Sequence, residues 1–216
     1  MRKVIVTVFT SLDGVVQAPG GPSEDRSGGF ALGGWSIPHW DEMMNEASAG
    51  FMEGTFDLLL GRGTFDIFAA HFPFAPDDPV AKKFTAATKY VATHRELTTT
   101  WEKTVPLTGN VLEAVAALKA GKGPELQVHG SPGLAQTLQE GGLVDEYRVW
   151  TFPLLLGHGK RLFAGMARPS LLRLESTEVS STGVVISVYS VGGEEVTTGT
   201  IPIIPVADPD PELRET

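Results

Sequence analysis

Lys3-Val4-Ile5-Val6-Thr7-Val8-Phe9-Thr10 is the stretch that decides the fold class of this chain. Nearly every position carries a β-branched or apolar side chain, which indicates a strand that is buried on both faces. Strands of this kind are typical of parallel or mixed sheets covered by helices. The stretch therefore predicts an α/β protein.

The rest of the chain supplies further strands and helices of the same kind. Strands are expected at 56–60, 89–93, 125–129 and 145–153, a weaker one at 98–101, a hairpin at 170–179 and 183–191, and an edge strand at 196–206. Helices are expected from Pro38 to about Gly54, in a short stretch after Thr64, and at 80–87, 111–120 and 131–140. These elements predict one α/β domain over residues 1–206, with a mixed sheet that is antiparallel towards its C-terminal end. Residues 207–216 are expected to form a loose tail.

Composition excludes several kinds of site. The 216 residues include no cysteine, so a disulfide framework, a thiolate zinc site, an iron–sulfur cluster and a cysteine nucleophile are excluded. The five histidines lie far apart in the sequence, and no metal site is expected. A net charge of −9 disfavours nucleic acid as a partner. The apolar runs are far shorter than the roughly 20 residues that span a bilayer, so we expect no membrane partner.

The N-terminus runs from Met1 directly into the first strand, without a cleavage site after a hydrophobic stretch. A cytoplasmic protein is the simplest interpretation.

Three segments share one arrangement, in which a buried strand ends in a turn that leads towards a helix. They are residues 61–64, 93–95 and 130–134. Free backbone N–H groups and the positive end of a helix dipole bind phosphate at such turns. Each turn alone can be an ordinary connection, but a dinucleotide needs both a pyrophosphate cradle and a cationic pocket. The G-x-G-x-x-G fingerprint and the Walker loop are both absent.

The arrangement resembles the dihydrofolate-reductase-like reductases, and within them the reductase domain of bacterial riboflavin biosynthesis. The resemblance covers about residues 3–192 and lies in Ser11-Leu12-Asp13-Gly14, Gly61-Arg62-Gly63-Thr64-Phe65-Asp66, Val128-His129-Gly130-Ser131, Gly142-Leu143-Val144-Asp145-Glu146 and Leu155-Leu156-Gly157-His158-Gly159-Lys160-Arg161-Leu162-Phe163. It implies a three-layer dihydrofolate-reductase-like fold, with a mixed, mostly parallel sheet and helices on both faces. It also implies NADPH as cofactor, a small heterocyclic or sugar-like substrate and a homodimer.

Matched by position, the resemblance assigns four groups of residues to the cofactor and its reaction. Gly61, Arg62 and Thr64 would meet the cofactor phosphates, while Thr93, His94 and Arg95 would lie by the adenosine 2′-phosphate, and Gly130, Ser131, Gly133 and Leu134 would form the second cradle. Asp13 and Gly14 would lie beside the nicotinamide.

His129 stands where the riboflavin-pathway reductases usually carry an acidic residue close to the reacting sugar. An imidazole can donate, accept or change charge near neutral pH. We therefore expect NADPH binding to survive, and reduction of 5-amino-6-ribosylaminouracil 5′-phosphate to be slow or absent. The alternative is a strand-end histidine that is satisfied within the protein and remote from the substrate.

Asp41 and Glu42 occupy the helix on which dihydrofolate reductases place an acid that grips the substrate. The alternative is that these acids are solvated and complement the helix dipole in the first turn.

Two other functions remain open from the sequence. Ser131 lies in a strand–turn–helix, as the nucleophile of a serine hydrolase would, although His129 replaces the first glycine of G-x-S-x-G and a helix cap explains Ser131 better. A cofactor-binding module without activity is the second alternative.

The loop after the first strand is rich in Gly and Pro. Part of residues 17–35 is expected to be a mobile lid that orders over the substrate, with a surface decoration as the alternative.

Overall fold

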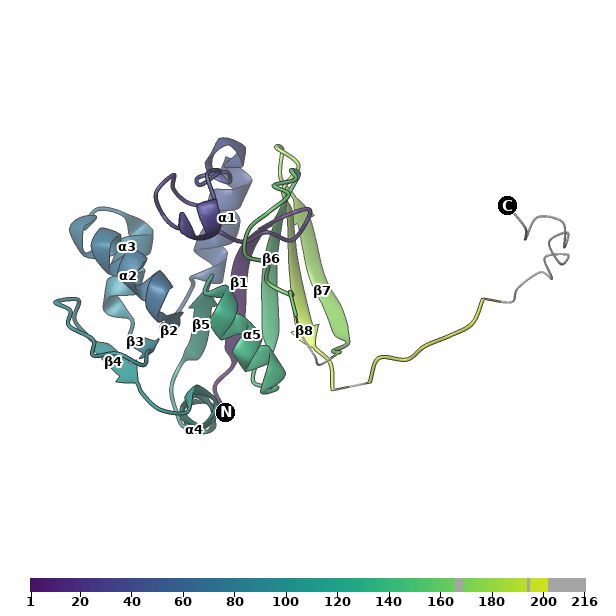
Figure 1. The fold of residues 1–216 in the computed structure, drawn as a ribbon. Helices are drawn as coiled ribbons and strands as arrows, with labels where there is room; N and C mark the ends of the chain where they lie inside the picture. Colours follow the sequence, from purple (N-terminus) through teal and green to yellow (C-terminus); the bar gives the residue numbers. More distant parts are fainter. Residues whose placement is uncertain (166–168, 194, 202–216) are drawn as a thin grey trace, which may run out of the picture.

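The computed structural model describes residues 1–165, 169–193 and 195–201, and these form one eight-stranded sheet (Figure 1). The strand order is β4-β3-β2-β5-β1-β6-β8-β7. The strands are β1 Val4–Ser11, β2 Phe56–Gly61, β3 Lys89–Ala92, β4 Thr104–Leu107, β5 Glu125–His129, β6 Glu146–Phe152, β7 Leu172–Val179 and β8 Val185–Val191. All neighbours from β4 to β6 pair in parallel, whereas β8 is antiparallel to both β6 and β7.

The α-helices are α1 Glu42–Phe51, α2 Arg62–His71, α3 Pro79–Ala86, α4 Val111–Ala120 and α5 Pro132–Glu140. Short 3-10 turns form at Ser27–Gly29, Ile37–His39 and Phe72–Phe74. Capping residues fix where three of the helices begin. Asn110 accepts hydrogen bonds from the first turn of α4, as its sequence pattern predicts.

The side chains of β1 point alternately to the two faces of the sheet, and a layer of helices covers each face. Val4, Val6 and Val8 pack into a core that α4 and α5 cover. Phe9 points to the opposite face, where α1 packs, and α2 and α3 cover β2 and β3 on that same face. Both faces of β1 are therefore buried, as its sequence predicts. The expected α/β fold, with a mostly parallel sheet, an antiparallel C-terminal hairpin and helices on both faces, is confirmed.

The prediction of a strand at residues 98–101 is wrong. Trp101 is buried against Phe65 and Phe72, and the strand forms three residues later, at Thr104–Leu107. Pro106 fits there because β4 is an edge strand, where a missing N–H costs no pairing on the outer side.

Two further expectations change. Pro38 lies in a separate 3-10 turn, and α1 begins only after Asp41. The edge strand predicted at 196–206 is absent from residues 196–201, and its remainder lies outside the described residues, as does the predicted tail at 207–216.

Candidate functional site

A cavity of about 1190 Å³ opens at the carboxyl ends of β1, β2 and β5. Pockets for one small ligand measure about 300–1,000 Å³, so this cavity has room for two reactants. Its rim consists of the turns that begin α2 and α5, and its inner part is aromatic. In open parallel sheets ligands bind at this edge.

The helices at the rim begin differently from the other helices. Asp41, Asp78 and Asn110 each accept hydrogen bonds from first-turn amides of α1, α3 and α4. At α2 and α5 the residues in the cap positions, Gly61 and Ser131, form no such side-chain bond. The first-turn N–H groups of these two helices are therefore free to meet an anion.

Ser131 joins the two turns to one another. Its Oγ accepts a hydrogen bond from Gly61 N (3.0 Å) and donates one to Thr64 Oγ1 (2.7 Å). The prediction that Ser131 caps its own helix is therefore wrong. Ser131 has a left-handed backbone (φ 53°) before α5, and its hydroxyl bonds to the start of α2 and not to the amides of α5. No histidine bonds to this hydroxyl within the described chain, so the hydrolase alternative has no base.

Three glycines leave the rim open. A Cβ on Gly63, Gly130 or Gly133 would meet no atom within 4 Å outside its own local chain, and all three residues line the cavity. The cradle therefore has space where a phosphate would lie. Leu134, which also lines the cavity, is 8% exposed and anchors α5 in the core.

Thr93, His94 and Arg95 follow β3 at the same edge of the sheet, outside the cavity lining. Ala92 pairs with Gly61, which places this turn next to the start of α2. The Thr93 hydroxyl accepts from Arg95 N and donates to Arg95 O, so it holds the turn in shape.

The basic side chains near α2 differ in how they are used. Arg62 pairs with Asp66 and donates to Glu96 O, whereas His94 and Arg95 are exposed, and Arg95 forms no ion pair with a described residue. Arg95 is therefore free to meet an anionic group beside α2.

The inner part of the cavity, which we call the aromatic compartment, lies on the sheet face covered by α1, α2 and α3. It is lined by Phe9, Trp40, Phe51, Phe68, Phe72, Phe84 and Trp150. Trp40 stacks on Trp150 with ring centroids 5.7 Å apart, and Phe84 contacts His129 at 5.0 Å. Such walls suit a flat, uncharged ring.

The basic residues of the cavity wall lie outside this compartment and are already paired. Lys160 pairs with Asp25, and Arg161 pairs with Asp13. Arg148 lies on the compartment side of the sheet, but it is bound to Glu146 and to the Phe51 carbonyl. The described residues thus offer no free cation to a substrate phosphate inside the aromatic compartment.

His129 lies at the end of β5, lines the cavity and bonds to Gln127, and its position relative to the substrate stays a prediction. Burial, with a smaller contribution from Arg148, lowers its pKa to about 4. The imidazole is therefore neutral at pH 7, and of the three abilities of a histidine it keeps those of donating and accepting a hydrogen bond there.

Asp13 and Gly14 line a smaller neighbouring pocket. The Asp13 carboxylate accepts hydrogen bonds from Ser11 Oγ (2.6 Å), Leu156 N (3.0 Å) and Gly157 N (2.9 Å). These bonds, led by the Ser11 hydroxyl, hold the pKa of Asp13 well below its usual range. The carboxylate thus connects β1 to the 154–157 turn, and its place beside the nicotinamide stays a prediction.

Asp41 also has a structural role. It caps α1 through Met44 N and accepts hydrogen bonds from Ser181 N and Ser181 Oγ. The Ser181 hydroxyl and the Met44 amide lower the pKa of its carboxyl. Asp41 is not part of the cavity wall, so the helix-dipole alternative describes it better than a substrate-gripping acid.

The loop expected to be a lid forms one wall of the cavity through Gln17–Gly20, Glu24, Asp25 and Ser27. Trp35 and Phe30 anchor it in the core, and Trp35 donates to Gln17 O. Its mobility stays a prediction. Burial raises the pKa of Glu24, which makes it an acid in the wall that the sequence did not indicate.

Thr7 and Trp150 are further residues that the sequence did not indicate. Thr7 Oγ1 and Trp150 Nε1 are buried without a hydrogen-bond partner among the described residues. In sequence both belong to ordinary buried strands, so no signal distinguished them.

Two kinds of feature are absent from the described residues. Those residues contain no group of three or more His, Cys, Asp or Glu side chains that could hold a metal ion. No helix among them has both the length and the apolar character to cross a bilayer.

The family model of the RibD C-terminal domain matches residues 2–186. The chain belongs to this family. Two relatives from Bacillus subtilis (strain 168) are the uncharacterized protein YyaP, which is 28% identical and aligns over 89% of this chain and 96% of its own, and the uncharacterized protein YwjB, at 25% identity over 82% and 91%.

Solved structures show the same fold for this family member. The "Putative riboflavin biosynthesis protein" from Shewanella sp. PV-4 is 23% identical, with a TM-score of 0.68 over 88% of this chain and 99% of its own. Dihydrofolate reductase from Enterococcus faecalis, solved with NADP(H), is 14% identical, with a TM-score of 0.55 over 88% and 96%. The chain thus has the dihydrofolate reductase fold, and its membership of the RibD C-terminal domain family confirms the resemblance.

Proposed function

We propose that this protein is an NADPH-dependent reductase that transfers hydride to a small uncharged planar compound. The observation that carries the proposal is the pair of uncapped helix starts, at α2 and α5, on the rim of a cavity large enough for two reactants. When bound, NADPH supplies the hydride. The chain supplies binding and orientation.

The residues of the rim fit this cofactor. The first-turn amides of Arg62, Gly63 and Thr64, with those of Gly133 and Leu134, would hold the pyrophosphate. Pro132 has no N–H to contribute. Arg95, with His94 beside it, would hold the adenosine 2′-phosphate, because a guanidinium offers a permanent bidentate charge.

The aromatic compartment supports a substrate without a phosphate group. Its walls are aromatic, His129 is neutral there, and the nearby cations are paired. We therefore expect a small carbonyl, imine or reduced-pterin-like substrate, and not 5-amino-6-ribosylaminouracil 5′-phosphate.

Two measurements test the proposal. Calorimetry should show tighter binding of NADPH than of NADH, and absent NADPH binding contradicts a reductase. Expression in a bacterium lacking only the riboflavin reductase step should not restore growth without riboflavin. Full growth would return the function to the pathway reaction.

The same assays separate an inactive cofactor-binding module from an enzyme. Tight NADPH binding, with no candidate compound accelerating NADPH oxidation, would favour the module. The cytoplasmic location and the homodimer stay predictions.

A further inference from the structure

Gln127 is a fully buried amide that connects α1 to the wall of the cavity. Its Nε2 donates to Phe51 O (3.0 Å) and to Glu125 Oε1 (2.7 Å). A carbonyl and a carboxylate can only accept, so the orientation of the amide is fixed, and Gln127 Oε1 must face His129.

The orientation of the Gln127 amide also fixes which ring nitrogen of His129 carries the proton. His129 Nε2 lies 2.9 Å from Gln127 Oε1. Since that oxygen can only accept, His129 Nε2 carries the proton. A neutral imidazole with its proton on Nε2 has an acceptor at Nδ1, and Nδ1 has no partner among the described residues.

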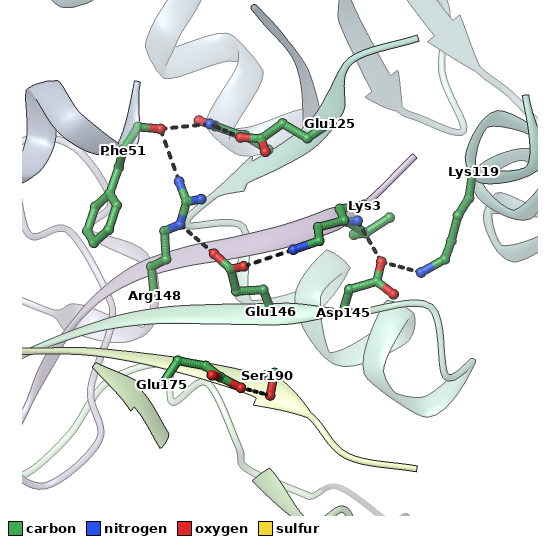
Figure 2. A network of polar contacts seen from close by, with 11 residues as sticks. Lys3, Phe51, Lys119, Glu125, Asp145, Glu146, Arg148, Glu175 and Ser190 are labelled. Carbon is green, nitrogen blue, oxygen red and sulfur yellow. Dashed lines mark hydrogen bonds and ion pairs between the residues drawn. The ribbon is translucent and has the colours of Figure 1, made fainter. Parts of the chain in front are cut away.

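The Phe51 carbonyl that orients Gln127 is itself anchored. Arg148 donates to it at 3.0 Å and to Glu146 Oε1 at 2.8 Å, as Figure 2 shows. The Arg148 guanidinium also lies over the Phe51 ring, 4.6 Å from its centroid. The tautomer of His129 is thus held by the last residue of α1 and by residues of β5 and β6, the strands on either side of β1.

Thr7 lies directly opposite His129 in the parallel pairing of β1 with β5. Neighbouring strands are about 4.8 Å apart, and both side chains point to the same sheet face and line the cavity. Thr7 is 9% exposed, and its hydroxyl lacks a partner. A buried hydroxyl without a hydrogen-bond partner is unfavourable, and a polar group of a bound ligand would supply the missing hydrogen bond.

We propose that Thr7 and His129 form a hydrogen-bonding pair for the amide edge of a flat, uncharged ring, with Gln127 as the positioning residue that keeps His129 an acceptor. His129 Nδ1 would accept a ring N–H, and Thr7 Oγ1 would donate to the adjacent carbonyl. This inference rests on the proposed function, because it places the substrate in the aromatic compartment.

The first test needs neither a variant nor a ligand. A long-range ¹H–¹⁵N spectrum of the imidazoles should show His129 neutral at pH 7, protonated at Nε2 and bare at Nδ1. A proton at Nδ1 would overturn the role of Gln127, whether or not the protein is a reductase.

The second test uses lumazine, a neutral ring with amide edges, and 1,3-dimethyllumazine, in which both ring N–H groups are blocked. With NADP⁺ bound, lumazine should bind at least about tenfold more tightly than the dimethyl compound, the effect of one lost hydrogen bond of about 1.4 kcal/mol. Thr7→Val should weaken the binding of lumazine by a similar factor, because it removes the donor to the ring carbonyl, and Thr7→Ser should restore it. NADP⁺ affinity should not change.

The outcomes separate the two proposals. Equal affinity for the two compounds, or no lumazine binding by a protein that still binds NADP⁺, overturns the amide subsite alone. A protein that binds neither NADP⁺ nor NADPH overturns the proposed function, and the spectrum still decides the tautomer.

Discussion

The five α-helices of the described chain fall into two groups at their N-termini. Three begin with a side chain that satisfies their first amides, and of these α1 and α3 line the inner part of the cavity. The other two, α2 and α5, begin without such a cap and meet at the rim. Caps stabilise a fold, whereas an uncapped start keeps its N–H groups for an anion. At the starts of α2 and α5 the protein therefore lacks the stability that a cap would add, and its free N–H groups are available for binding.

The strongest test of this comparison places a charge at an uncapped start. Gly133→Asp should weaken NADPH binding at least about 100-fold, because like charges about 4 Å apart repel by several kcal/mol at a protein surface. The same carboxylate should stabilise the fold by about 0.3–1 kcal/mol, because it faces the helix dipole. Calorimetry and urea unfolding measure the two effects. Gly133→Asn is the uncharged control, and equal losses in both variants would contradict an anion site.

The turn after β3 tests the part of the site that selects the cofactor. Arg95→Ala should weaken NADPH binding roughly 10- to 100-fold, because a charge-assisted hydrogen bond contributes about 1.5–3 kcal/mol. NADH binding should change little. The exposed Arg173 gives a matched control when replaced by alanine. Equal losses for NADPH and NADH on titration would show that Arg95 does not select the 2′-phosphate.

His129, on the strand leading to α5, should appear in the pH dependence of stability. Its pKa is about 4 in the folded protein and about 6.5 in the unfolded chain. Between these values the unfolded chain binds more protons, so the free energy of unfolding falls as the pH falls, by up to about 1.4 kcal/mol per pH unit. Urea unfolding from pH 7 to 4.5 should show a shallower slope in His129→Gln. Identical slopes would mean that His129 titrates normally.

Removing the cap of a capped helix should lower the stability of the protein and leave NADPH binding unchanged. Asp78→Ala removes the cap of α3 and should cost about 1 kcal/mol, or roughly 2–4 °C in Tm. NADPH affinity should stay unchanged. Thermal unfolding and calorimetry check both parts, and a loss of affinity would show that the two groups of helices are not independent.

The smallest effect is expected from a single methyl group. Gly63→Ala meets no neighbouring atom and should stabilise α2 by about 0.5–1 kcal/mol. It should also weaken NADPH binding, roughly threefold to tenfold, because the methyl group fills the cradle. Gly50→Ala in α1 is the matched control, with the same gain in Tm and unchanged affinity. Unchanged affinity in Gly63→Ala would move the phosphate away from α2.

Local patterns predicted most of the fold correctly. The buried pattern of β1 and the Asn110 cap of α4 arise from neighbours in sequence, and both are confirmed. Trp101 failed as a strand residue because its large side chain fills a distant core, and the edge strand forms further along the chain. Where a side chain packs at long range, local propensity gives way.

The sequence by itself determined the α/β class, the order of most elements and the turns that begin α2 and α5, because periodicity, caps and glycines act over a few residues. Only the tertiary structure decided what the polar side chains do. It joined Asp13 to the 154–157 turn and Asp41 to Ser181 by hydrogen bonds, turned the Ser131 hydroxyl towards α2, and set Thr7 beside a neutral His129. Those roles depend on groups that lie tens of residues apart in sequence and meet only when the sheet has formed.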